Sequence, residues 1–140
     1  MRIGRRWVLA LASVVVALPL LGWGPAHAAG AVPPTVVAGP GSFLAGFYTG
    51  TVVAQPGAAL TFSNGDFVSH NVVSVDFGPD TPACAAAGFA VGQCPVFWSV
   101  PIGVGQTAVN GTENLVAGKS YAFYCATHPA SMRGTLTASA

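Results

Sequence analysis

Charged side chains are scarce in this sequence of 140 residues: five Lys or Arg and four Asp or Glu make up 6% of the chain. Three of the five basic residues, Arg2, Arg5 and Arg6, fall within the first six positions. From residue 29 onward, two basic residues therefore stand against four acidic ones, a formal net charge of −2. Because phosphate backbones are bound by clusters of Lys and Arg, this balance argues against nucleic acid as a partner.

Long helical patterns are also lacking, because 18 Gly and 11 Pro interrupt the chain. Between them lie short β-prone runs, at residues 35–37, 43–48, 51–54, 59–63, 71–75, 96–100, 107–109, 120–124 and 135–138. Many short strands with regular turn signals are typical of a β-sandwich, so we predict one all-β domain. Tight turns are expected at Asn64-Gly65 and Asn110-Gly111, and one helical turn at residues 85–87.

Residues 1–28 have the features of a secretory signal peptide. A basic start is followed by an apolar run at residues 7–21 and ends in an Ala-His-Ala cleavage site. The run is shorter than the ~20 residues that a membrane-spanning helix needs, which argues against an uncleaved anchor. We therefore predict a signal peptide at residues 1–28. The mature domain, residues 29–140, is then secreted or periplasmic and has no stable membrane anchor.

Cysteine, histidine and methionine are few after the predicted signal peptide, where the full set is His70, Cys84, Cys94, Cys125, His128 and Met132. Cys84 and Cys94 enclose nine residues, and nearby cysteines usually pair in the oxidising compartments that exported proteins reach. Closing a loop of this size stabilises a fold by about 2–3 kcal/mol on the chain-entropy model. We expect this pairing, which leaves Cys125 free; either other pairing would engage Cys125.

A thiol, an imidazole and a thioether fall within eight positions, at Cys125, His128 and Met132. The alternating run before them and the β-prone run after them predict a strand, a short loop and a second strand. One Cys, two His and a weak axial Met form the ligand set of blue copper sites, and His70 is the histidine that remains to complete it. Taken singly, a buried thiol, a core histidine and a gap-filling methionine are the simpler interpretations. Their adjacency favours a copper site.

Catalytic motifs are lacking. The sequence has no Ser-His-Asp order, no phosphate-binding loop and no second cluster of metal ligands after the predicted signal peptide. The His-x-His and His-Cys-His motifs that a multicopper oxidase needs are absent as well. We therefore expect a protein that is not an enzyme.

Two motifs carry a resemblance to a known family. The first is Tyr-x-Phe-x-Cys-x2-His-Pro at residues 121–129, followed by Met-x-Gly-Thr at residues 132–135. The second is Asn-x-Asp-x3-His-Asn at residues 64–71. With these motifs the chain resembles the plastocyanin/azurin (cupredoxin) family, in particular its small secreted bacterial members. The spacing Cys-x2-His-x3-Met differs from that of plastocyanins, amicyanin-like proteins and azurins, and residues 78–95 are an insertion relative to plastocyanin.

The resemblance implies a Greek-key β-sandwich of about eight strands with one type 1 copper ion per chain. Matched by position, the ligands are His70, Cys125 and His128 with Met132 in the axial place, and Asn71 steadies the ligand loop by hydrogen bonding. Such a site implies that a monomer carries single electrons between transient redox protein partners outside the cytoplasm. Two alternatives stay open: a periplasmic or extracellular copper carrier or buffer without a redox role, and a copper-free, disulfide-stapled sandwich that binds another protein.

Overall fold

A computed structural model describes residues 32–140, so the predicted signal peptide lies outside the described residues. The described part of the chain contains seven strands, two short α-helices and one 3-10 helix. Neither of these α-helices has the length and apolar character needed to cross a bilayer. The described residues are thus mostly β, as the turn-rich sequence predicts.

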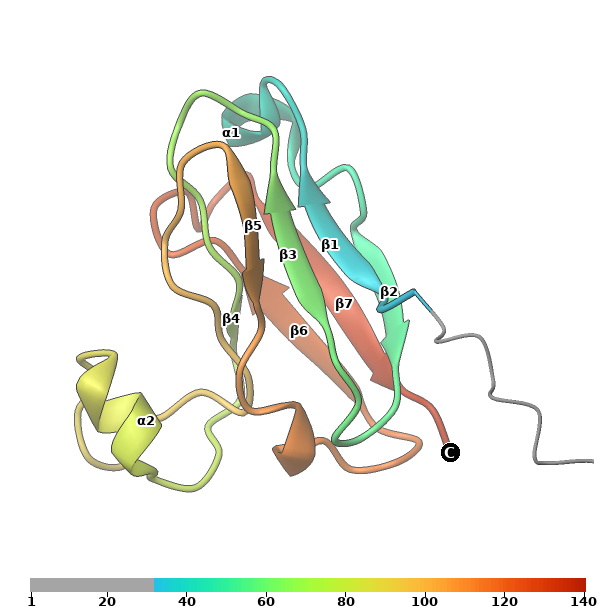
Figure 1. The fold of residues 1–140 in the computed structure, drawn as a ribbon, viewed down its shortest axis with the longest axis vertical. Coiled ribbons are helices and arrows are strands. Elements are labelled where there is room, and N and C mark those ends of the chain that lie inside the picture. Colours follow the sequence, from blue (N-terminus) through green and yellow to red (C-terminus); the bar gives the residue numbers. More distant parts are fainter. Residues whose placement is uncertain (1–31) are drawn as a thin grey trace, which may run out of the picture. The chain divides into compact units, whose positions relative to one another are not determined.

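The strands form two sheets that lie one behind the other (Figure 1). One sheet has three strands in the order β1 (Thr35–Ala38), β3 (Thr61–Asn64) and β5 (Gly105–Ala108). The other has four, in the order β2 (Thr51–Ala54), β7 (Arg133–Ala138), β6 (Ser120–Tyr124) and β4 (Val73–Ser74). Strands that follow one another in sequence often lie in different sheets, so the chain crosses repeatedly between the layers. The predicted Greek-key β-sandwich is confirmed.

The prediction of a strand at residues 43–48 is wrong, because the first part of this run belongs to the helix α1 (Ser42–Ala45). Gly41 and Gly46 flank the helix with φ values of 80° and 91°. These values lie in the left-handed region, which glycine enters readily and other residues rarely do. The two glycines therefore turn the chain at a place where β-prone residues alone predicted extension.

The run at residues 96–100 is paired without forming a named strand. Trp98 makes isolated β-bridges to Val73 and to Asn110. A proline on either side of the run lacks the backbone N–H that a longer ladder would need. The predicted turn after Asn110 leads into the 3-10 helix η1 (Thr112–Asn114).

The core between the sheets extends to the end of β6, where the predicted ligands begin. Tyr121 and Phe123 point inward from this strand and Cys125 is the next inward residue; none of the three is more than 2% exposed. The Phe123 ring packs against those of Phe47 and Phe97, with centroids 5.3 and 6.3 Å apart. Full burial of such a side chain stabilises a fold by about 1.5–3 kcal/mol, so Cys125 stands at the edge of a tightly held core.

Gly134 of β7 has a steric reason to be glycine. A Cβ atom there would collide with the ring of Phe123 and would lie 2.8 Å from the carbonyl oxygen of Gly50. The Gly of the Met-x-Gly-Thr motif therefore leaves room for the Phe123 ring to pack against the backbone of β7. This packing fixes the two strands that carry the ligand loop.

The insertion of residues 78–95 carries the helix α2 (Pro82–Ala86), which lies at the lower left of Figure 1. Cys84 and Cys94 form a disulfide bond, and Cys125 is a free, buried thiol. The predicted pairing is confirmed. The helix begins close to the single turn predicted from the alanine run.

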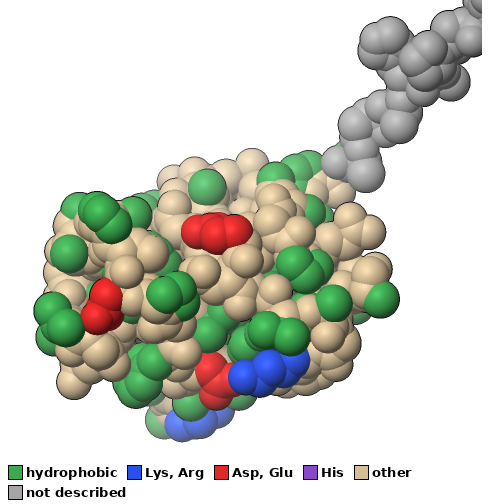
Figure 2. Space-filling model, turned by 90° about the horizontal axis from the view of Figure 1, so that it is seen from below, with side chains coloured by type: hydrophobic (Ala, Val, Ile, Leu, Met, Phe, Trp, Pro, Cys, Tyr) green, Lys and Arg blue, Asp and Glu red, His purple; other side chains and the backbone are tan. Residues whose placement is uncertain are grey.

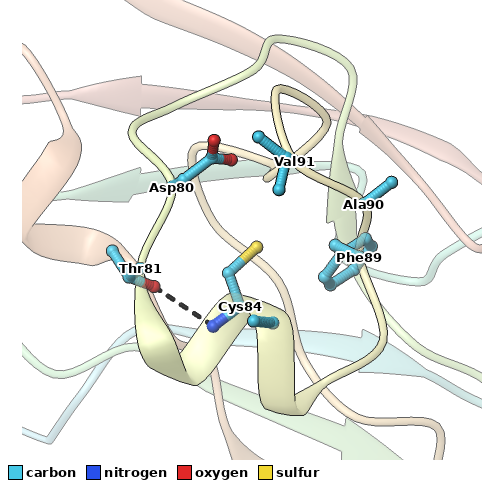
Figure 3. A pocket seen from close by; sticks show the side chains of 7 residues that line it. Asp80, Thr81, Cys84, Phe89, Ala90 and Val91 are labelled. Carbon is cyan, nitrogen blue, oxygen red and sulfur yellow. Dashed lines mark hydrogen bonds between the residues drawn. The ribbon is translucent and has the colours of Figure 1, made fainter.

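A side-chain cap starts the helix of the insertion. The Oγ1 atom of Thr81 accepts a hydrogen bond of 3.1 Å from the N–H of Cys84 (Figure 3). A cavity of about 30 Å³ lies beside these residues and reaches Phe89 and Val91. This volume holds little more than a water molecule, so the cavity is not a binding site for a larger ligand.

Surface charges lie mostly at the end of the sandwich that is remote from Cys125. Lys119 Nζ lies 2.8 Å from Asp76 Oδ2, and this partner raises the pKa of Lys119. Asp80 belongs to the insertion and Glu113 to η1. Figure 2, the view from below, shows acidic and basic side chains on this face and no histidine. Lys119 precedes β6 and Cys125 follows it, which separates them by roughly 20 Å at the rise of a strand.

Candidate metal centre

The loop between β6 and β7 contains three of the four predicted ligands. The N–H of Cys125 donates to the carbonyl of Met132 over 3.1 Å and closes the loop at its base. Within the loop, the N–H of His128 donates to Cys125 O over 3.1 Å, and that of Met132 donates to His128 O over 3.0 Å. Three hydrogen bonds among the three residues hold the loop in one compact conformation.

His70 reaches the site from the connection between β3 and β4. Its N–H and C=O pair with the backbone of Ile102 over 3.1 and 2.9 Å in an isolated β-bridge. The ring is fully buried. This histidine therefore lies at a bridged, strand-like position just before β4 (Val73–Ser74).

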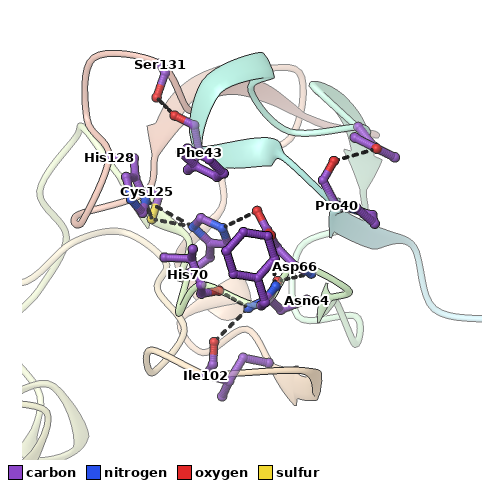
Figure 4. Close-up of polar contacts among 12 residues, drawn as sticks. Pro40, Phe43, Asn64, Asp66, His70, Ile102, Cys125, His128 and Ser131 are labelled. Atoms are coloured by element: carbon purple, nitrogen blue, oxygen red, sulfur yellow. Dashed lines mark hydrogen bonds and ion pairs between the residues drawn. The ribbon is translucent and has the colours of Figure 1, made fainter.

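Three potential donor atoms, one each from Cys125, His70 and His128, form a compact triangle. Cys125 Sγ lies 3.6 Å from His70 Nδ1 and 3.8 Å from His128 Nδ1, and the two Nδ1 atoms are 3.1 Å apart. The point equidistant from all three, the circumcentre of this triangle, is about 2.0 Å from each atom, and metal bonds to imidazole nitrogen and thiolate sulfur are about 2.0–2.3 Å long. Figure 4 shows the three side chains pointing toward one another. These three side chains would hold a single metal ion between them.

The chemistry of the donor set fits copper. A thiolate with two imidazoles in a trigonal arrangement is the blue copper pattern, and its soft sulfur suits Cu(I). The structure thus brings His70, Cys125 and His128 together as a potential metal site, with the first two buried and His128 partly exposed.

Met132, the predicted axial ligand, is fully buried in the same core cluster as Cys125. Its backbone bonds to both Cys125 and His128 hold it at the end of the loop. Its neighbours are the two loop ligands, as the short spacing predicts. Its bond to the metal remains a prediction.

Asn71 links the two segments that supply the ligands. Its Oδ1 accepts a hydrogen bond of 2.8 Å from the N–H of Ala126, the residue after Cys125. Asn71 itself directly follows His70 and is 5% exposed. The expectation that this asparagine steadies the ligand loop is confirmed by this bond.

Asp66, for which the sequence alone predicts no role, lies against the far side of the His70 ring. Asp66 Oδ2 is 3.2 Å from His70 Nε2, and both side chains are fully buried. Burial alone raises the pKa of Asp66, but hydrogen bonds from His70 and from the backbone of Gly41 and Phe67 lower it below its usual value. The signal was present in the sequence as the Asp of the Asn-x-Asp-x3-His motif, but spacing does not reveal a contact across a loop.

Helix α1 brings a second contact that the sequence did not predict. The ring of Phe43 lies with its centroid 6.3 Å from that of His128 and 6.1 Å from that of Phe67. The hydroxyl of Ser131 donates to Phe43 O over 2.6 Å and ties the helix to the ligand loop (Figure 4). Because a strand was expected here, the aromatic cover beside His128 was missed.

Known structures share this fold at low sequence identity. A purple cupredoxin from Nitrosopumilus maritimus aligns with a TM-score of 0.51 and 20% identity over 75% of this chain and 98% of its own. Auracyanin from Roseiflexus castenholzii gives 0.53 and 19% over 76% and 95%. Auracyanin A from Chloroflexus aurantiacus, described as a blue copper protein, gives 0.52 and 20% over 76% and 98%. No curated protein matches the chain in sequence.

A family model supplies the assignment. Residues 36–139 match the model of copper binding proteins of the plastocyanin/azurin family. The cofactor is therefore copper, in a His-Cys-His(-Met) site typical of electron-transfer blue copper proteins. Cupredoxins of this kind are electron carriers rather than enzymes. The chain belongs to the plastocyanin/azurin family of copper binding proteins.

Proposed function

We propose that this protein carries single electrons between redox proteins outside the cytoplasm through a type 1 copper site. The ligands in this proposal are His70, Cys125 and His128, with Met132 as the weak axial ligand. The observation that carries it is the triangle of Sγ and two Nδ1 atoms with sides of 3.1 to 3.8 Å. When bound there, copper supplies the one-electron couple between Cu(II) and Cu(I).

The residues around the triangle support fast electron transfer by limiting movement. His70 is held by its bridge to Ile102, and the loop of Cys125 by its bonds to Met132 and Asn71. Ligands that cannot move keep one geometry for both oxidation states, so little reorganisation accompanies the gain or loss of an electron. Burial of Cys125 excludes water from the sulfur and protects the thiolate from oxidation.

His128 supports the proposed route of the electron. It is partly exposed, whereas His70 and Cys125 are fully buried. Exposed apolar side chains lie near this end, namely Leu44 and Phe67. An electron would therefore pass through the His128 ring to a partner protein that docks here transiently.

The disulfide bond supports export, because such bonds persist in oxidising compartments. In this proposal, residues 1–28 are a signal peptide and residues 29–140 a secreted or periplasmic monomer. The partner in this proposal is a redox protein, and the charge balance argues against nucleic acid as a partner.

The test is to load the mature domain with Cu(II), record its visible spectrum and scan its potential by voltammetry. We expect an intense blue band from thiolate-to-copper charge transfer and a reversible one-electron wave. A colourless protein, or one that binds Cu(I) tightly without a reversible wave, would instead support a copper carrier or buffer. A protein that binds no copper would support the third alternative, a copper-free sandwich that binds another protein.

A further inference from the structure

We propose that Asp66 is a positioning residue that fixes the tautomer of His70 and lowers the reduction potential of the copper site. The observation is the contact of 3.2 Å between Asp66 Oδ2 and His70 Nε2, with both side chains fully buried. The redox half of this inference rests on the proposed function. The tautomer half concerns the protein without its metal and stands separately.

The tautomer follows from what each atom can donate. A neutral imidazole carries one N–H, and an ionised carboxylate can only accept hydrogen bonds. Asp66 therefore holds the proton on Nε2 of His70, which leaves the lone pair of Nδ1 directed toward Cys125 Sγ. The opposite tautomer would point an N–H into the donor triangle and leave Nε2 without a donor for the carboxylate. Hydrogen bonds of this kind orient metal-binding histidines and fix their tautomer.

Asp66 can hold His70 because the carboxylate is itself held. Its Oδ1 accepts a hydrogen bond of 2.8 Å from the N–H of Phe67, and its own N–H donates to Asn64 Oδ1 over 2.9 Å. The amide of Asn64 in turn donates to Val68 O over 2.8 Å and to Ile102 O over 2.9 Å. The chain bends at residues 66–68, just after the predicted turn at Asn64-Gly65, and this bend places the carboxylate under the ring.

The same arrangement ties Asp66 to the backbone that carries His70. Asn64 bonds to Ile102 O, and Ile102 forms the β-bridge with His70. Asn64, which holds Asp66, and His70 are therefore both hydrogen bonded to the backbone of Ile102. The loop from Asn64 to His70 is in this sense a single rigid unit built around one buried negative charge.

The effect on the potential follows from this charge. Asp66 is the one fully buried carboxylate among residues 32–140. A negative charge in a poorly solvated position favours the more highly charged metal ion. It therefore stabilises Cu(II) over Cu(I) and lowers the potential. Within residues 32–140 the only Lys and Arg are Lys119 and Arg133, and neither forms an ion pair with Asp66.

The diagnostic change is Asp66→Asn, which keeps size and shape but removes the charge. If the Asn oxygen keeps the bond from Phe67 N–H, its amide NH₂ faces His70 Nε2, which must then accept. The matched control is Asp76→Asn, because the Asp76 side chain is 43% exposed and has Lys119 as its partner. Both variants lose one negative charge, so only the position of that charge differs.

The first measurement needs no copper. Two-bond ¹H–¹⁵N correlation spectra of the metal-free protein distinguish an imidazole protonated on Nε2 from one protonated on Nδ1. We expect the proton of His70 on Nε2 in the wild type and in Asp76→Asn, and a substantial population on Nδ1 in Asp66→Asn. A wild-type proton on Nδ1, or an Asp66→Asn spectrum with the wild-type tautomer, would overturn the inference, since a purely structural role would not move this proton.

The second measurement is the reduction potential of the copper-loaded proteins. We expect Asp66→Asn to shift the one-electron equilibrium toward Cu(I) by about tenfold, which is 59 mV for a one-electron couple, and Asp76→Asn by less than about twofold. Equal shifts in both variants would overturn the redox half. A wild type without a reversible wave would refute the proposed function instead, and the tautomer experiment would still decide the role of Asp66. If Asp66→Asn does not fold, the wild-type tautomer alone decides it.

Discussion

The two ends of the sandwich are stabilised in different ways. At the metal end, His70, Asp66 and Cys125 are fully buried, and hydrogen bonds between loops hold them against the main core. At the other end, the insertion of residues 78–95 is mostly exposed, and its own core consists of the disulfide bond, Trp98 and Phe89.

The difference shows where a covalent bond is needed. A segment too small to bury much apolar surface depends on a crosslink for its order, whereas the metal loops extend a core that already exists. All the predicted ligands lie at the metal end and the disulfide bond lies at the other. A substitution that disrupts one end should therefore leave the other intact. The experiments below try to break this separation, beginning with the largest expected effect.

Cys125→Ser should abolish the blue band completely, because the thiolate that supplies the charge transfer is gone. The double variant Cys84→Ser/Cys94→Ser should keep the band, because the two cysteines that it replaces form the remote disulfide bond and are not ligands. Visible spectra with Cu(II) make the comparison. A band that survives in Cys125→Ser would remove this residue from the site, and a band lost in the double variant would show that the two ends are coupled.

The same double variant should lower the free energy of unfolding by about 2–3 kcal/mol, since the disulfide bond closes a loop with a sequence separation of 10 residues. Denaturant titration of the metal-free protein measures this loss. The potential of the copper-loaded variant should equal that of the wild type. A shifted potential would mean that the insertion positions the ligands and that the two ends of the sandwich are coupled.

The metal end could be predicted from sequence because its ligands are few. After the predicted signal peptide only two histidines and one unpaired cysteine are available, so His70, Cys125 and His128 followed almost by elimination. The alternation of Tyr121 and Phe123 also placed the thiol on the inner face of β6. The sandwich and the disulfide bond were predictable for similar reasons, from short strands and from two nearby cysteines.

Contacts between segments far apart in the sequence could not be predicted. The β-prone residues around Phe43 indicated a strand, and only the φ values of Gly41 and Gly46 show why the chain turns into α1 instead. The contact of Asp66 with His70 depends on a bend that the hydrogen bonds of Asn64 create. Such contacts are set by tertiary packing, which local pattern does not encode.

Asn71→Ala should destabilise the metal end without affecting the insertion. The change removes the 2.8 Å acceptor of the N–H of Ala126, and a hydrogen bond of this kind contributes about 0.5–1.5 kcal/mol to stability. Denaturant titration and amide exchange at Ala126 measure the effect. Asn110→Ala is the control, since this exposed asparagine makes only a 3.4 Å contact with Trp98 O. Equal losses in the two variants would argue against a special role for Asn71.

Met132→Leu tests whether the buried thioether is a ligand or only part of the core. Leu preserves the apolar volume, so the fold should be kept and copper should still bind. Loss of a weak donor disfavours Cu(II), and we expect a rise in the potential on the order of tenfold in the equilibrium constant, or 59 mV. Voltammetry decides the question: an unchanged or lower potential would show that Met132 only packs.

The smallest effect should be that of salt on docking. The charged side chains Asp76, Asp80, Glu113 and Lys119 belong to the end remote from the copper loop, and Asp66 is buried, so Arg133 is the charged residue beside the loop. A partner that approaches His128 therefore meets a nearly neutral surface. Association without electrostatic steering runs at about 10⁵–10⁶ M⁻¹s⁻¹, and added salt should change this rate little because there is little charge for it to screen.

The measurement is the second-order electron-transfer rate with a redox partner at low and at high ionic strength. We expect a change of less than about threefold, and Arg133→Ala should remove most of it. A fall of more than about tenfold would reveal a charged docking face and would move the partner toward the insertion end.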